Sequence, residues 1–331
     1  MRRLLTFILI AAVLAMLAGV WQWNQWRQFL DTPVNPDSAL ALSIEPGDSL
    51  GDLIDQLEIL GLARSDWRWR LYGRLETPSL QRGEFLIGPD LTIDRLISAL
   101  ESGDVREHRF TIVEGWTVEK LRQVLSNDPR LRHDGQSLTT EALMAEFGCT
   151  DCPAEGRFLP ETYFFRRGSS DLELMERAYR AMTVALAEAW AQRDPDLPID
   201  SPEELLILAS LIERETGAAF ERPEVAGVFK RRLELGMRLQ TDPTVVYGLD
   251  DSFDGRIRRV HLRTDHPWNT YTRHGLPVTA IALPGRASLL AAAKPAEGTS
   301  LYFVSRGDGT HYFSDTLREH NAAVDRYIRG R

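Results

Sequence analysis

Two glutamates, Glu213 and Glu215, stand at the end of a long apolar segment, where a carboxyl group can do acid–base chemistry. The segment, residues 201–217, reads SPEELLILASLIERETG. Burial disfavours the charged form of a carboxyl group and so raises its pKa, and a raised pKa suits a general acid at neutral pH. The alternative is that both glutamates are solvated helix-end residues flanking Arg214.

The segment that positions these glutamates is predicted to be a buried helix. Ser201 can cap it, Pro202 suits the first helical position, and Glu204 follows the cap at the spacing of a capping box. Gly217 is expected to end the helix in the left-handed conformation. Residues 205–209 are apolar on all sides, which is typical of a helix enclosed by its domain.

The helical repeat separates the two glutamates. At about 100° per residue, Glu213 falls on the side of the small residues Ala209 and Ser210, which leave room for a ligand. Glu215 falls among bulky apolar residues such as Leu211, which indicates packing. The repeat therefore favours Glu213 as the residue that meets a ligand.

The N-terminus has the pattern of a membrane anchor. Arg2 and Arg3 precede a run without charge, and tryptophans follow it. The run is close to the roughly 20 residues that span a bilayer, and its flanking residues place the N-terminus in the cytoplasm. A cleaved signal peptide is the alternative, although no clean A-x-A site follows. We expect a cytoplasmic tail (1–3), an uncleaved single-pass anchor in the inner membrane (4–23) and a periplasmic remainder.

The rest of the chain is long enough for two or more domains. Residues 24–39 are polar, contain two prolines and are expected to form a linker. Residues 40–104 are predicted to form a small α/β subdomain, and their strand, PGDS turn and helix look like the sugar-binding LysM module. Residues 105–331 are predicted to form a larger α+β catalytic region with its core at 200–331. The expected fold class is α+β.

Composition and cysteine spacing exclude several kinds of function. The net charge of −9 argues against nucleic acid as a partner, because nonspecific binding needs a basic surface. Cys149 and Cys152 are the only cysteines, and we expect a local disulfide. A thioredoxin-type site would need a long helix after the motif, where Pro153 stands instead. The histidines lack metal-ligand spacing, so we expect no metal and no cofactor.

Several segments, in this order, resemble the YceG-like family of endolytic murein transglycosylases. They are ASLIERET (209–216), LQTDPT (239–244), NTY (269–271) and GTHYFS (309–314), with EG (114–115) and EGRFLPETY (155–163) upstream and HN (320–321) downstream. The resemblance covers everything after the linker. It implies that Glu213 is the catalytic acid/base.

The resemblance also implies a reaction that needs one carboxylate. In such a lyase the 6-hydroxyl of MurNAc attacks its own anomeric carbon, so the MurNAc–GlcNAc bond breaks without water and leaves a 1,6-anhydro end. Cleavage within nascent glycan strands is expected to terminate their elongation. Polar residues near Glu213 would support the positive charge of the transition state, although each could equally cap a turn. The candidates are Gln240, Thr241, Asp242, Asn269 and Tyr271.

Two other functions are compatible with the sequence. A non-catalytic scaffold could bind peptidoglycan through the LysM-like unit and recruit partners. A hydrolytic muramidase would need a second carboxylate, for which Asp242 or Glu161 is the nominee. Under any of these functions the expected partners are peptidoglycan glycan strands and the inner membrane, with peptidoglycan synthases as further candidates.

Overall fold

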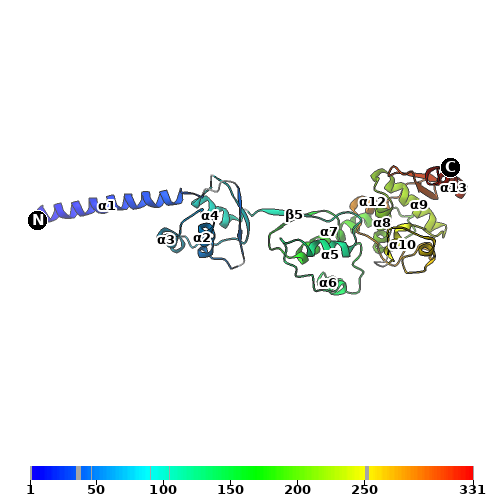
Figure 1. Ribbon diagram of the computed structural model, residues 1–331, viewed down its shortest axis with the longest axis horizontal. Helices are drawn as coiled ribbons and strands as arrows, with labels where there is room; N and C mark the ends of the chain where they lie inside the picture. The colour runs from blue at the N-terminus through cyan, green and yellow to red at the C-terminus, as the bar shows by residue number, and fades with distance from the viewer. Residues whose placement is uncertain are drawn as a thin grey trace. The chain divides into compact units, whose positions relative to one another are not determined.

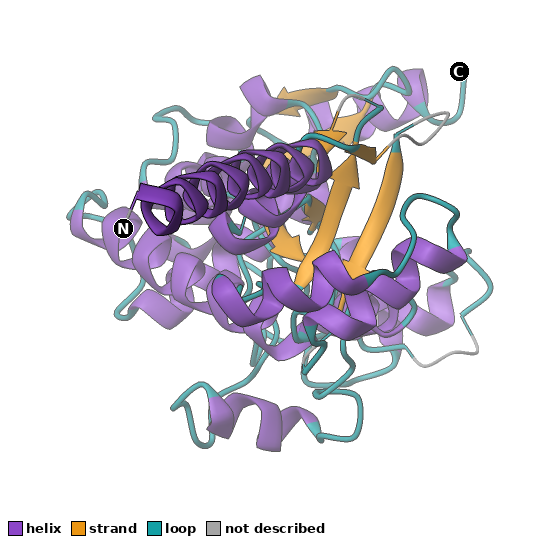
Figure 2. Ribbon diagram, turned by 90° about the vertical axis from the view of Figure 1, so that its left-hand side faces the viewer, coloured by secondary structure: helices purple, strands orange, loops and turns teal. Residues whose placement is uncertain are grey.

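The computed structural model describes residues 2–34, 39–45, 47–89, 91–103, 105–249 and 253–330, with side chains from Thr6 onward. The described residues combine helices with short two-stranded sheets, which confirms the α+β class (Figure 2). Pro46 of the expected PGDS turn, linker residues 35–38 and the domain-boundary residue 104 lie outside the described residues.

The chain divides into two compact units. The N-terminal unit comprises Met1–His108 and Phe164–Gly168, and the C-terminal unit comprises Arg109–Tyr163 and Ser169–Arg331 (Figure 1). Strands β5 (Glu107–Thr111) and β6 (Thr162–Arg166) form a two-stranded sheet, and the chain passes from one unit to the other within these strands. The expected boundary after residue 104 lies a few residues before this crossing.

The N-terminal helix α1 (Arg2–Leu30) is long and apolar enough over Thr6–Leu30 to cross a membrane. The expected linker at 24–39 is wrong for its first residues, because α1 continues through them. Phe29 is buried, with its ring centroid 5.2 Å from that of Trp69. Strand β1 (Pro33–Val34) then pairs with β4 (Leu91–Thr92). The side chains of Phe29 and Val34 are buried in the N-terminal unit, so these residues are packed as part of its fold.

The rest of the N-terminal unit contains the expected strand and helix, followed by a second helix and a second strand. Strand β2 (Leu40–Ile44) pairs antiparallel with β3 (Gly83–Ile87), with α2 (Leu50–Ile59) and α3 (Trp67–Leu75) between them in the sequence. Helix α4 (Ile93–Ser102) follows and ends at Gly103, whose φ of +73° is left-handed. The likeness of this unit to the LysM module and its binding of sugar both stay predictions.

The C-terminal unit is mainly helical and ends in a hairpin and a helix. The hairpin pairs β7 with β8, with Phe303 opposite Phe313. The elements in chain order are α5 (Val118–Ser126), α6 (Thr140–Glu146), α7 (Asp171–Ala191), α8 (Pro202–Glu215), a 3₁₀ turn (Ala219–Glu221), α9 (Arg222–Glu234), α10 (Asp242–Tyr247), α11 (Arg259–Arg263), α12 (Arg286–Ala293), β7 (Tyr302–Ser305), β8 (His311–Ser314) and α13 (Leu317–Tyr327).

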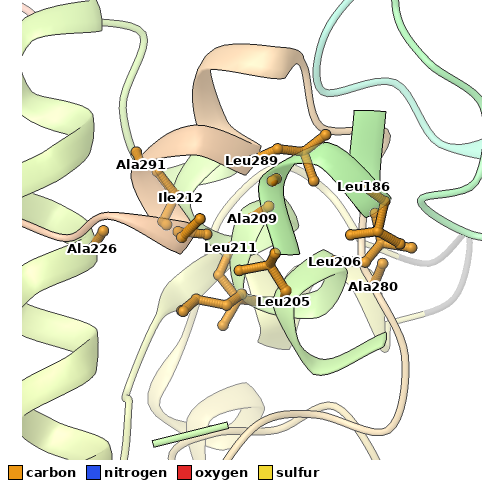
Figure 3. Close-up of a cluster of buried hydrophobic side chains, with 14 of the residues drawn as sticks. Leu186, Leu205, Leu206, Ala209, Leu211, Ile212, Ala226, Ala280, Leu289 and Ala291 are labelled. Carbon is orange, nitrogen blue, oxygen red and sulfur yellow. The ribbon is translucent and has the colours of Figure 1, made fainter. Parts of the chain in front are cut away.

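Helix α8 forms the centre of this unit's core, as its apolar sequence predicts. All of its residues from Leu205 to Ile212 are buried, and α7, α9, α10 and α12 contact it (Figure 3). Burying one such leucine or isoleucine side chain contributes about 1.5–3 kcal/mol. The helix is therefore a fixed base for the glutamates at its end.

Both ends of α8 differ in detail from the prediction. Ser201 accepts from the amide of Glu204 at 3.2 Å, but the Glu204 carboxylate binds the amide of Asp200, so the capping box is incomplete. The helix ends because Thr216 is extended, and Gly217 does not adopt the left-handed conformation. The Thr216 hydroxyl bonds Glu221 at 3.3 Å and thereby fixes the turn.

Candidate active site

A cavity of about 400 Å³ lies at the C-terminal end of α8. Four parts of the C-terminal unit meet there: the end of α8, helix α9, α10 with the loops around it, and the β7–β8 hairpin with α13. The lining residues are Glu215, Arg232, Gln240, Asp242, Tyr271, Tyr302, Phe303, Val304, Ser305, His311, Leu317 and His320.

Glu215 is the carboxyl group of α8 that faces this cavity. Its side chain accepts a hydrogen bond from the Thr241 hydroxyl. Burial raises the pKa of Glu215 to about 7, although the Thr241 hydrogen bond acts in the opposite direction. A carboxyl group with this pKa carries a proton in about half of the molecules at neutral pH and can both donate and accept one.

Gln240, Asp242 and Tyr271, which the sequence analysis nominated beside Glu213, line the cavity of Glu215 instead. The Tyr271 hydroxyl donates to Asp242 Oδ1 at 2.6 Å, and burial raises the pKa of Tyr271 above its ordinary value. Gln240 has a φ of +49°, a left-handed conformation that costs free energy for a residue other than glycine. Its amide donates to the Thr270 carbonyl at 3.2 Å, which helps to hold this conformation.

The cavity is also lined by a cation and two histidines that the sequence analysis did not nominate. Arg232 donates from Nε to the Leu301 carbonyl at 2.7 Å and lies over the Tyr302 ring, 5.2 Å from its centroid. His311 contacts the buried Glu221 through Nδ1 at 2.8 Å, and His320 stacks on Tyr302. The histidines lie within the segments that carry the family resemblance, which was the available signal.

Glu213 is enclosed by other parts of the chain, whereas the sequence predicts open space for a ligand beside it. Its side chain is only 4% exposed, pairs with Arg222 at 3.2 Å and accepts from the Gly285 amide at 2.9 Å. The small-residue side of α8 is covered by the loop that follows residue 279, whose Ile281 amide donates to Ser210 at 3.1 Å. The expectation of open space beside Glu213 is therefore wrong, because another part of the chain fills it.

Two of the nominated polar residues have internal partners and do not line the cavity. Asn269 is fully buried, donates to the Thr264 carbonyl at 2.7 Å and accepts from the Tyr271 amide at 2.8 Å. Thr241 is also buried, and its hydroxyl is used by Glu215. Both residues hold the loops that form the cavity, so the prediction that they contact substrate is not supported by their surroundings.

Glu161, a nominee for a second catalytic carboxylate, also lies outside this cavity. It pairs with Arg286 at 3.0 Å on the surface. Asp242, the other nominee, lines the cavity with Glu215. Cys149 and Cys152 are joined by a disulfide, as predicted.

Comparisons with known proteins extend over nearly the whole chain. A sequence model described as the YceG-like family matches residues 42–326. The endolytic murein transglycosylase of Bacillus subtilis (strain 168) is 29% identical over 317 residues, which cover 89% of this chain and 87% of that protein. The endolytic murein transglycosylase of Streptococcus pneumoniae serotype 2 (strain D39 / NCTC 7466) is 22% identical, over 98% of this chain and 66% of that protein.

A solved structure shows the same fold. The crystal structure of a YceG-like protein from Listeria monocytogenes superposes with a TM-score of 0.54 and 26% sequence identity. The match covers 86% of this chain and 99% of that one.

Proposed function

The chain belongs to the YceG-like family, and from this premise we propose that it is an endolytic murein transglycosylase whose acid–base group is Glu215. The observation that carries the residue assignment is the position of Glu215 at the end of α8. The Glu215 side chain faces a polar cavity of about 400 Å³, and burial raises the pKa of its carboxyl group to about 7. Murein is the substrate named for the relatives in Bacillus subtilis and Streptococcus pneumoniae.

In the proposed reaction Glu215 begins as the neutral acid. It donates its proton to the glycosidic oxygen between MurNAc and GlcNAc as the bond from that oxygen to the anomeric carbon breaks. The 6-hydroxyl oxygen of MurNAc then bonds the same anomeric carbon, and its proton passes to the Glu215 carboxylate. The acid is regenerated, water is not consumed, and the product carries a 1,6-anhydro end.

The remaining cavity residues support this reaction by charge and position. The ring carbon becomes positive as the bond breaks, and Asp242 is the nearby carboxylate of the cavity wall that can stabilise that charge. The hydrogen bond from Tyr271 holds Asp242 in place. Thr241 orients Glu215 through its hydroxyl.

Glu213 receives a positioning role in this proposal. The family resemblance implies the first glutamate of the ERE sequence as the acid, but the contacts with Arg222 and the Gly285 amide occupy that carboxylate. Both of its oxygens are bound by groups of the protein, and Glu213 does not line the cavity that Glu215 faces, so it is not placed to meet the glycosidic oxygen. We propose that Glu213 fixes the end of α8 against the loop that contains Gly285.

Mass spectrometry of the products tests the activity. The full-length protein in detergent is incubated with purified murein, and the soluble fragments are weighed. We expect fragments with 1,6-anhydro ends, each lighter by one water than a hydrolysed end. Fragments with hydrolysed ends, or the absence of cleavage, would reject the transglycosylase.

Hydrolysis is the second candidate, and the position of Asp242 in the cavity of Glu215 is the observation that favours it. A retaining hydrolase uses one carboxyl group as acid and a second as nucleophile. The same mass measurement separates the two reactions, because only hydrolysis adds water. Murein that the protein binds but does not cleave would indicate a glycan-binding scaffold instead of an enzyme.

We also propose that α1 anchors the protein in the inner membrane, with its N-terminus in the cytoplasm and both compact units in the periplasm. Support comes from the apolar stretch Thr6–Leu30 and from the two arginines that precede it. Carbonate extraction of membranes should leave a full-length chain in the pellet, whereas a shortened soluble chain would indicate a cleaved signal. An anchored enzyme that cuts nascent strands works beside the synthases that extend them, so we expect synthases to co-purify with it.

A further inference from the structure

A second hollow surface of the C-terminal unit lies along α10 and includes its C-terminal end. Two cavities there, of about 550 and about 470 Å³, adjoin, because they share four lining residues. We call these cavities together the distal groove. Helix α10 begins with Asp242 in the active-site cavity and ends with Tyr247 in the distal groove. The shared residues are Glu119, Glu155, Tyr247 and Trp268.

Two aromatic rings form a fixed part of this groove. The centroids of Tyr247 and Trp268 are 5.3 Å apart with the rings at 70°, and both residues pack against the core of the C-terminal unit. Trp268 Nε1 donates to the Thr279 hydroxyl at 2.8 Å, and the Tyr247 hydroxyl donates to Glu155 at 3.1 Å. The rings are therefore held in one orientation before any ligand binds, which lowers the entropy cost of binding.

Polar groups surround these rings. Glu155 is 8% exposed and also accepts from the Val118 amide at 3.1 Å, and burial raises its pKa to about 7. Glu119 and Arg214 are exposed side chains of the same groove. Arg214 directly precedes Glu215 in α8. The acid–base reaction at Glu215 uses none of these groups.

We propose that the distal groove binds N-acetylhexosamine rings of the strand that is cut, away from the cleaved bond. This inference rests on the proposed function. The six residues of α10 span about 9 Å, so one strand can occupy both cavities. Aromatic faces with a few polar groups suit the apolar faces and the hydroxyl and acetamido groups of such sugars. The groove makes the enzyme prefer long strands.

Binding of peptide-free glycan strands tests this proposal. The full-length protein in detergent carries Glu215→Gln, which prevents turnover, and its affinity is measured for long strands and for a tetrasaccharide. Adding Trp268→Ala should weaken long-strand binding about tenfold, a typical effect of losing one aromatic contact. The tetrasaccharide should lose less affinity, because it can occupy the active-site cavity alone.

A second variant guards against misfolding, since Trp268 packs against the core. Glu119→Ala changes only an exposed side chain of the groove and should also weaken long-strand binding more than tetrasaccharide binding. Lys120→Ala, at the next and also exposed position of α5, is the matched control and should change neither affinity.

Equal losses for both ligands, or unchanged long-strand binding in Glu119→Ala and in a folded Trp268→Ala, would overturn the proposal. A length preference seen only with peptide-bearing strands would assign the groove to the peptide instead. Because binding is measured without turnover, these results do not depend on whether the wild-type products are anhydro sugars.

Discussion

Glu213→Gln should destabilise the fold, because Glu213 is a buried partner in an ion pair. Glutamine can still accept from the Gly285 amide, but its own amide then faces the Arg222 guanidinium. Removing one partner of a buried pair costs roughly 3–5 kcal/mol. Arg222 keeps a second partner, Glu114, at 3.2 Å, although that carboxylate is 45% exposed and so more strongly screened. We therefore expect a loss of roughly 1–3 kcal/mol of unfolding free energy.

Glu215→Gln should change stability in the opposite direction at alkaline pH. The pKa of Glu215 rises from 4.5 to about 7 on folding, so the ionised carboxylate is less favourable in the folded state. The folded state thus loses stability as pH rises from about 4.5 through about 7, by up to about 3 kcal/mol above that range. Glutamine removes this loss, so the variant should be more stable than wild type at pH 8 and similar to it below pH 4.5.

Melting temperatures of both variants at pH 8 and pH 5 measure these effects. One kcal/mol corresponds to roughly 2–4 °C for a domain of about 150–250 residues. Glu176→Gln is the control, because it breaks an exposed ion pair with Arg180 and should cost no more than about 1 kcal/mol. The reasoning is refuted if Glu213→Gln melts like wild type while Glu215→Gln melts lower at pH 8.

Three further predictions concern the surroundings of Glu215 and the disulfide. The rate of anhydro-product formation should fall as pH rises through about 7, the pKa of Glu215. Thr241→Val should move this fall to higher pH, because it removes a hydrogen bond that favours the ionised carboxylate. A pH–rate profile that is the same in Thr241→Val and wild type would contradict this. Asn269→Ala should lower unfolding free energy by roughly 1–3 kcal/mol, because buried carbonyls lose their donor; denaturant unfolding measures it, and a wild-type midpoint would argue against that role. Replacing both Cys149 and Cys152 with serine should lower the unfolding free energy by no more than the low end of about 2–4 kcal/mol, because the loop that the disulfide closes is short. The double variant should keep its activity. Loss of activity in a folded double variant would show that the disulfide matters for catalysis.

The sequence was informative where one residue type determines local structure. Ser201 and Pro202 mark the start of α8, and the apolar residues after them predicted its burial. A turn with Gly307 and Gly309 between two short apolar runs is typical of a hairpin, and β7 and β8 form one there. Pro243 in the first turn of α10 and the buried Val245 suit the short helix that the structure has there.

The site depended on contacts that local patterns do not contain. The helical repeat placed Glu213 beside Ser210, but it could not show that the loop at Ile281 covers that side of α8. The helical repeat placed Glu215 near bulky apolar residues. It could not show that Thr241 and Tyr271, from distant segments of the sequence, lie beside Glu215 and help to form a polar cavity. Tertiary packing decided which glutamate is enclosed and which faces the cavity.

The most direct test of the central claim is the initial rate of anhydro-product formation at pH 7 by two variants of the full-length protein in detergent. We predict that Glu215→Gln lowers the rate by at least about 10²–10⁴-fold, the usual contribution of general acid–base catalysis, while its fold stays intact. Glu213→Gln should keep most of the activity at temperatures where it remains folded. An active Glu215→Gln together with a folded but inactive Glu213→Gln would contradict the assignment and return the acid to Glu213.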